Sequence, residues 1–363
     1  MTTTGPSHHT LDDLDRKIVA ALQIDGRASW STIAELCGTT GPTVARRVQQ
    51  LVNDGVVKVA VMRGAEASDS HEFYFLRLRC GPVMALTVAR RIAERPDIRF
   101  VTLLTGQYDI IAEAMVPRRP GSYHALVQEI QAIPGVEGVS GELILHVYKV
   151  SHDWARELLG LEPAEPTATT KEYAEVRLEE ADAAILDSLQ VDARASFSDV
   201  AKKVGMNEST VRRRFERLLS RQWAHVVTLV QATALGFEAE VQLRVDVEPA
   251  QLTEVAGELA RRPEVRYLAL TLGTNGLVAE VITRHAEQLY TFITDVLAGL
   301  PGVTGWTASL ELLTVKRGFV ETPWWQMEVA RIGSSANEPP DACDSSAPRL
   351  GQDREPSGAD VVS

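Results

Sequence analysis

The chain has 363 residues, of which 45% are hydrophobic and 24% charged, and its formal net charge is −12. These values exclude a fibrous or wholly disordered chain and predict two to four packed domains. No apolar stretch reaches the roughly 18 residues of a membrane span, residues 1–10 do not resemble a signal peptide, and the three cysteines form neither a disulfide framework nor a zinc motif. We therefore expect a cytoplasmic protein that spans no membrane.

An internal repeat organises the sequence. When the chain is shifted by 167 residues, 17 of the 41 residues between positions 11 and 51 match their counterparts without a gap, and identities continue as far as Lys149 and Lys316. Two copies of one unit are therefore joined in tandem. The divisions that we predict are a disordered N-terminus (1–10), helix-turn-helix 1 (11–62), ferredoxin-like module 1 (63–150), a linker (151–177), helix-turn-helix 2 (178–229), ferredoxin-like module 2 (230–317), a C-terminal helix (318–332) and a disordered acidic tail (333–363).

The first part of each unit is predicted to consist of three helices. From Leu14 onward, apolar residues recur at the spacing of one buried helix face. A short second helix is expected to begin after Ser29 and to end at Gly38, and a third to begin with Thr40 as its N-cap. A glycine-containing turn between two such helices is typical of a helix-turn-helix. Copy two has Ser196, Gly205 and Asn207 at the matching positions.

The third helix of each copy carries the charge that favours DNA binding. Residues 201–221 hold seven basic and two acidic residues although the whole chain is acidic, and such a local positive field suits phosphate contact. Surface arginines that are merely hydrated would give the same pattern, so both interpretations stay open at this point. The residues that we expect to face a DNA major groove are Thr40, Thr43, Ala45, Arg46, Arg47, Asn207, Glu208, Ser209, Thr210, Arg212, Arg213 and Arg214.

The second part of each unit alternates strands and helices. The order β-α-β-β-α-β indicates a ferredoxin-like sandwich with its helices on one sheet face. The fold class is therefore α+β, a tandem repeat of a tri-helical or winged helix-turn-helix and a βαββαβ module. Two copies in one chain can bury their open sheet faces against each other. In copy one, strands are predicted over 73–79, 98–105, 110–116 and 136–149, and helices over 83–94 and 122–133.

These segments resemble the leucine-responsive/asparagine regulator (Lrp/AsnC) family. The similarity is carried by "ALQIDGRASWSTIAE" at 21–35, "LLTGQYDIIAEAMVP" at 103–117 and "IPGVEGVSGELILHVYK" at 133–149. The resemblance implies a transcriptional regulator that binds double-stranded DNA as a homo-oligomer. Its C-terminal module, the RAM module, pairs through its sheet and binds a small effector, often an amino acid, near that junction. Family members usually have one unit per chain, so one chain here is expected to correspond to one family dimer.

The loop between the second and third strands of module 1 is similar to the family's effector loop. It contains Gly106, Tyr108 and Asp109. A carboxylate such as Asp109 could hold an α-ammonium group, and glycine amides could receive a carboxylate. An ordinary hairpin turn explains the same residues equally well. Copy two has Gly-Thr-Asn-Gly at 273–276, a strong hairpin sequence without the aromatic ring and the carboxylate, so we expect it to sense poorly or to bind a different ligand.

The principal hypothesis from the sequence is an effector-modulated DNA-binding regulator that uses no cofactor and no metal. Because the two third helices differ in sequence, we expect an imperfect palindrome with unlike half-sites about 34–36 Å apart, or a multiple of that. The alternative is enzymatic, because fused two-unit relatives of this family include sirohaem decarboxylases that act on haem precursors. A sensor that binds amino acids without DNA is a third possibility.

Overall fold

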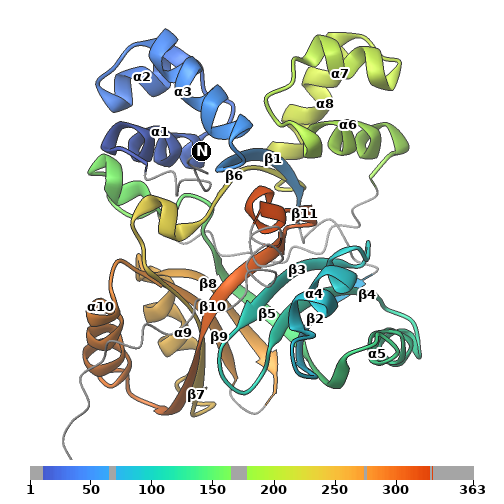
Figure 1. Cartoon of the computed structure of the whole chain (residues 1–363), viewed down its shortest axis with the longest axis vertical. Helices are drawn as coiled ribbons and strands as arrows, with labels where there is room; N and C mark the ends of the chain where they lie inside the picture. Colours follow the sequence, from blue (N-terminus) through green and yellow to red (C-terminus); the bar gives the residue numbers. More distant parts are fainter. Residues whose placement is uncertain (1–10, 65–70, 165–177, 274–275, 328, 330–363) are drawn as a thin grey trace, which may run out of the picture.

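Two helical units lie at one end of the molecule and a ring of strands at the other (Figure 1). The computed structural model describes residues 11–64, 71–164, 178–273, 276–327 and 329. The predicted N-terminal stretch, the acidic tail and residues 165–177 of the predicted linker lie outside the described residues. Among the residues that are described, every helix is too short or too polar to cross a lipid bilayer.

Each helical unit begins and ends its helices where the local sequence predicts. Ser29 Oγ accepts from the amide of Thr32 at 3.1 Å, and Ser196 Oγ from that of Asp199 at 3.0 Å. The second helices end at Gly38 and Gly205, which adopt the left-handed backbone that glycine allows. Unit one contains α1 (Asp13–Ile24), α2 (Trp30–Cys37) and α3 (Gly41–Asn53), and unit two contains α6 (Glu180–Val191), α7 (Phe197–Val204) and α8 (Glu208–Ser220).

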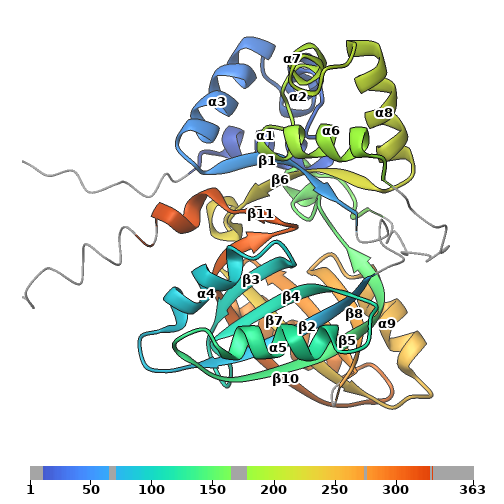
Figure 2. The ribbon, with the colours of Figure 1, turned by 90° about the vertical axis from the view of Figure 1, so that its right-hand side faces the viewer.

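A two-stranded ribbon that the sequence analysis did not predict joins the helical units. Strands β1 (Val57–Arg63) and β6 (Ala224–Val230) follow α3 and α8 and pair only with each other, in antiparallel order. Ala60 lies opposite Val227, its own counterpart in the repeat. The pseudo-twofold axis therefore passes through the ribbon, which lies between the helices and the ring (Figure 2).

The second part of each unit has the predicted βαββαβ order. One four-residue 3₁₀ turn, Arg156–Leu159, follows the last strand of module 1, and another, Ala232–Leu235, precedes the first strand of module 2. Module 1 contains β2 (His71–Cys80), α4 (Ala85–Ala93), β3 (Ile98–Leu104), β4 (Ile110–Pro117), α5 (Ser122–Gln131) and β5 (Val136–Val150). Module 2 contains β7 (Ala239–Val247), α9 (Leu252–Arg261), β8 (Val265–Leu272), β9 (Leu277–Thr283), α10 (Ala286–Thr291) with a π-helical continuation (Phe292–Leu297), and β10 (Val303–Arg317), after which β11 (Val320–Glu321) pairs with β10.

The two modules share strands and do not merely face each other. The first half of β5 pairs with β2 of its own module, and its second half pairs with β8 of the other module. Strand β10 does the same with β7 and β3. The eight strands consequently close into one antiparallel ring, with the helices of both modules outside it (Figure 2). The prediction that the open sheet faces of the two modules pack against each other is thus correct. The hydrogen bonding between strands of the two modules was not predicted.

Alternation along the strands separates two kinds of core. Leu76 and Leu78 of β2 point outward and pack beneath the helices of module 1, whereas the preceding Phe75 points into the ring and packs with Phe100 and Val278. Module 2 has its own helix-covered cluster. Trp324 and Trp325, in the helical residues 323–327, are buried against the module 1 core and the ribbon.

A reciprocal pair of arginines fixes the two helical units against each other. Arg27 donates to the backbone oxygens of Ala193 and Ala195, and its repeat counterpart Arg194 donates to those of Gly26 (2.6 Å) and Ala28 (3.0 Å). Each guanidinium also lies over an aromatic ring, Arg27 over Phe197 at 4.3 Å and Arg194 over Trp30 at 3.7 Å. We call these two residues the arginine clasp.

Arg27→Ala is expected to lower the free energy of unfolding by about 1–3 kcal/mol, because two partly buried carbonyl oxygens lose their donor. Urea denaturation followed by circular dichroism measures the change. The matched control is Arg91→Ala, which removes an exposed arginine of α4 and should change stability by less than about 0.5 kcal/mol. Equal stability of the two variants would contradict a structural role for the clasp.

Candidate DNA-binding helices and a polar cavity

The first turns of α3 and α8 present short polar side chains at the end of the molecule away from the ring. The predicted cap at Asn207 is confirmed, since Asn207 Oδ1 accepts from the amide of Thr210 at 2.8 Å and from Ser209 Oγ at 2.8 Å. Thr40 occupies the N-cap position of α3 as predicted, but its side chain does not cap the helix. Its hydroxyl makes no bond to a helix amide and lies 2.9 Å from that of Thr43 instead, because Pro42 and the preceding Gly41 already begin the helix.

The predicted DNA-facing arginines fall into two groups, of which the first is exposed. Arg46 of α3 and Arg212 and Arg213 of α8 all have exposed side chains. Arg212 lies 2.8 Å from Glu208, four residues earlier on the same helix, and over the ring of Phe197 at 4.8 Å. Exposed pairs of this kind contribute little to stability. Either side chain can therefore leave this pair for another partner at a small cost in free energy.

The second group, Arg47 and Arg214, is engaged in ion pairs within the helical units. Arg47 lies 2.7 Å from Asp12 and 2.8 Å from Asp15, and these carboxylates raise the pKa of its guanidinium, with Asp15 the stronger contributor. At the equivalent place in copy two, Arg214 and Arg217 both reach the buried Asp182, at 2.9 and 2.7 Å. The first helix of each unit is thereby fixed to the third, and the charge of these arginines is already balanced.

The predicted effector loop lies where module 1 meets β10 of module 2. The amide of Leu310 donates to Thr105 Oγ1 at 3.0 Å, just before Gly106. Asp109 Oδ2 accepts from the amide of Cys80 at 2.7 Å, so this carboxylate shapes the loop. Arg77 lies over the ring of Tyr108 at 5.0 Å. Of the equivalent loop in copy two, residues 274 and 275 lie outside the described residues.

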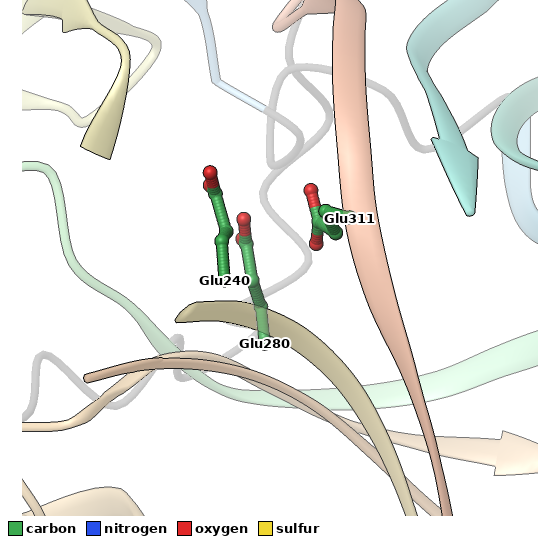
Figure 3. Close-up of side chains that lie close together, drawn as sticks. All are labelled: Glu240, Glu280 and Glu311. Atoms are coloured by element: carbon green, nitrogen blue, oxygen red, sulfur yellow. The ribbon is translucent and has the colours of Figure 1, made fainter. Parts of the chain in front are cut away.

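Three carboxylates meet inside the ring. Glu240, Glu280 and Glu311 point toward one another from β7, β9 and β10 (Figure 3), and their nearest oxygens lie within 4.8 Å of one another. Oxygen sets of this kind suit hard cations, but here guanidinium groups supply the positive charge. Arg317 forms a bidentate pair with Glu280 at 3.0 and 2.7 Å, and Arg266 lies 2.7 Å from Glu240.

Burial and neighbouring charges shift the pKa values of these carboxyl groups in opposite directions. Burial opposes the ionisation of Glu280, but Arg266 and Arg317 outweigh it and lower its pKa to about 2. For Glu311, burial together with the charges of Glu280 and Glu240 raises the pKa well above its ordinary value. Glu311 also lies 2.6 Å from Gln242 Nε2, which donates to it. The surroundings of Glu311 therefore favour its protonated form, whereas those of Glu280 favour the ionised form.

Glu311→Gln is expected to raise the free energy of unfolding at neutral pH and to change it little at about pH 4. A raised native pKa means that the folded state binds a proton which the unfolded state releases, so wild-type stability falls as pH rises from the ordinary pKa toward the native one. Each unit of pKa difference corresponds to about 1.4 kcal/mol. Urea denaturation at about pH 4 and about pH 7 tests this, and a variant less stable than wild type at both values would contradict it.

A polar cavity of about 80 Å³ lies between this end of the ring and the ribbon. Phe75 and Phe100 form part of its apolar wall, and Val227 and Leu229 of the ribbon close it on the side of the helical units. Burial, with His225 and Arg266, lowers the pKa of His152 in its wall to about 3, so this imidazole is neutral. Polar side chains that line the cavity include Arg99, Glu113, His152, Thr228, Gln242 and Tyr267.

Sequence reasoning missed this interior although a signal was present. Glu113 and Glu280 occupy the same position of the two copies, each in the middle of an otherwise apolar strand. A charged residue there is costly to bury without a partner. The repeated glutamate therefore indicated a buried ion pair, but its partners come from strands that only the closed ring brings together.

Family models match four segments of the chain. A model described as the AsnC-type helix-turn-helix domain matches residues 11–52 and 178–219, and one described as the Lrp/AsnC ligand binding domain matches residues 74–154 and 239–320. These segments make up more than half of the chain. The chain belongs to the Lrp/AsnC family. The resemblance inferred from the sequence is thereby confirmed, as is the tandem α+β fold.

Curated relatives of this Lrp/AsnC protein are named as transcriptional regulators. An uncharacterized HTH-type transcriptional regulator of Pyrococcus abyssi is 34% identical over 146 residues, which cover 39% of this chain and 90% of the relative. The HTH-type transcriptional regulator FL11 of Pyrococcus horikoshii is 31% identical over 142 residues, or 39% of this chain and 93% of the relative. Each relative thus corresponds in length to about one of the two units, and the chain is a regulator of this family rather than an enzyme.

A solved structure shares the tandem fold. The siroheme decarboxylase NirDL matches with a TM-score of 0.56 at 14% identity, covering 89% of this Lrp/AsnC chain and 100% of its own. At so low an identity the likeness concerns the fold alone. The enzymatic alternative is therefore not favoured, since the family matches and the more similar relatives are regulatory.

Proposed function

We propose that this Lrp/AsnC regulator reads two unlike DNA half-sites with α3 and α8, and that an amino acid bound by the paired modules modulates this binding. The observation that carries the proposal is the pair of helical units held on one side of the ribbon by the arginine clasp, each with a polar first turn and exposed arginines on its third helix. Such a pair suits two half-sites at a fixed separation.

The residues divide by the contacts they already make. Arg46, Arg212 and Arg213 are the arginines that we assign to phosphates, because their side chains are exposed. Arg47 and Arg214 we assign to orienting the recognition helices, because each is paired with carboxylates of its own unit. Base edges would be contacted from the first turns. The residues proposed for that role are Thr40, Thr43, Ala45, Asn207, Glu208, Ser209 and Thr210.

An effector would act on this arrangement through the modules. The loop with Gly106, Tyr108 and Asp109 lies against β10 of the other module, so a ligand there contacts both halves of the ring. The second carboxylate oxygen of Asp109 is the proposed acceptor for an α-ammonium group. We also propose that several chains assemble, as the family resemblance implies.

Arg213→Ala is expected to weaken DNA binding and to reduce the slope of log affinity against log salt by about 1, with unchanged stability, because it removes one phosphate contact.

Arg214→Ala is expected to lower the free energy of unfolding by about 1–3 kcal/mol, because Asp182 loses one of two cationic partners. Gel-shift assays on the protein's own upstream region and urea denaturation measure the two effects. Arg91→Ala serves again as the control.

Undiminished DNA affinity and salt slope in Arg213→Ala would contradict the assignment of α8 to DNA. Failure of the wild-type protein to bind any genomic fragment at low ionic strength would overturn the proposed function as a whole.

A further inference from the structure

The two halves of the polar interior, which are related by the repeat, have diverged. In copy two, Arg266 has Glu240 at 2.7 Å and Glu280 at 3.5 Å, and Glu280 is paired again by Arg317. The positions of copy one that correspond to Glu240 and Arg317 are Phe73 and Val150. Copy one therefore retains only the central pair of this network, Arg99 and Glu113.

This loss leaves Arg99 with unused donors at the cavity. Its Nε lies 3.5 Å from Glu113 Oε2, and its guanidinium lies over the ring of Phe73 at 5.4 Å. Within the part of the chain that the structure describes, no side chain or backbone oxygen accepts from its two terminal nitrogens. Guanidinium groups bind carboxylates with those nitrogens, so the cavity offers an anion the place that Glu240 takes in copy two.

Two further polar atoms at the same cavity lack partners. Tyr267 Oη and Gln242 Oε1 are buried and make no hydrogen bond among the described residues. Buried polar atoms of this kind cost free energy unless a ligand or water satisfies them. Burial and the nearby Glu113 raise the pKa of Tyr267 well above its ordinary value, so its hydroxyl remains a donor. Two donors, Arg99 and Tyr267, and two acceptors, Glu113 and Gln242, thus line one cavity.

We infer that this cavity binds a small zwitterion, an α-amino acid no larger than about alanine, with its carboxylate on Arg99 and Tyr267 and its ammonium group on Glu113 and Gln242. The volume of about 80 Å³ is roughly half of the 150 Å³ that accommodates benzene in a protein interior, which favours a ligand with a small side chain. One ligand per chain is expected, because only copy one has lost its internal counter-charge. The site is separate from the loop with Asp109.

The cavity also contacts the platform that carries the helical units. Its wall includes Thr228 of the ribbon, whose hydroxyl donates to the backbone oxygen of Leu22 in α1 at 2.7 Å. A ligand in the cavity therefore contacts a side chain that is bonded to the first helix of unit one. A regulatory effect of this ligand rests on the proposed function, because it requires that the chain binds DNA. Coupled binding would then mean that DNA and ligand change each other's affinity by the same factor.

Isothermal titration calorimetry of the full chain with glycine and L-alanine tests the inference, with acetate, methylamine and L-leucine as comparison ligands. We expect saturable binding of one glycine or alanine per chain, at least about tenfold weaker binding of the two singly charged compounds, and no binding of leucine to this site. Arg99→Gln should abolish the binding and Arg99→Lys should restore part of it, while Arg91→Ala, the exposed control in α4, should leave it unchanged.

Phe73→Glu is a second variant that does not depend on removing Arg99. It places a carboxylate where copy two has Glu240, so it should pair with Arg99 and exclude the ligand, and thermal denaturation shows whether it remains folded. Binding that survives in Arg99→Gln and in folded Phe73→Glu would overturn the inference, as would binding lost in Asp109→Asn alone, which would place the ligand at the loop.

The two proposals fail separately. DNA binding without any response to glycine or alanine would overturn the cavity inference and leave the proposed DNA contacts standing. Arg99-dependent binding of alanine by a protein that ignores all DNA fragments would overturn the proposed function and leave the cavity site standing.

Discussion

The exchange of strand halves between the two modules is the constraint on which the rest of the structure depends. Strands β5 and β10 each begin in their own sheet and end in the other. Neither sheet can therefore complete its hydrogen bonding alone, and the two copies have to fold together. The ribbon strands β1 and β6 directly precede the ring strands β2 and β7 in the order of strands, so the ribbon connects the ring to both helical units.

The repeat keeps this frame symmetric while the interior has diverged. The residues that hold the frame occur in matched pairs, as Arg27 with Arg194 and Arg47 with Arg214 do. Inside the ring, by contrast, copy two has Glu240 in an ion-pair network, and copy one has Phe73 at the equivalent position. A single chain can accept such one-sided changes because each position occurs once in the molecule. In a symmetric dimer of identical chains, every substitution would appear on both sides of the axis.

Local features of the fold followed from the sequence, and long-range pairings did not. Ser29 and Gly38 bound α2 as their residue types predict, and the alternation of β2 indicated its two faces. The ribbon was missed because its strands, 167 residues apart, carry no local signal for each other. The DNA-facing set was predicted from charge and from position on the third helix, and neither shows that Asp182 lies beside Arg214 after folding. The cavity required Arg99 and Tyr267 from different copies, so only closure of the ring reveals it.

Closure of the ring also limits how several chains can associate. A strand with unpaired backbone groups can accept a strand from another molecule, but every one of the eight ring strands has a bonded neighbour on each side. Large apolar side chains remain exposed on the same ring, among them Trp306 at 46% and Leu312 at 60%. A contact between chains at the ring would therefore use side-chain docking rather than sheet extension.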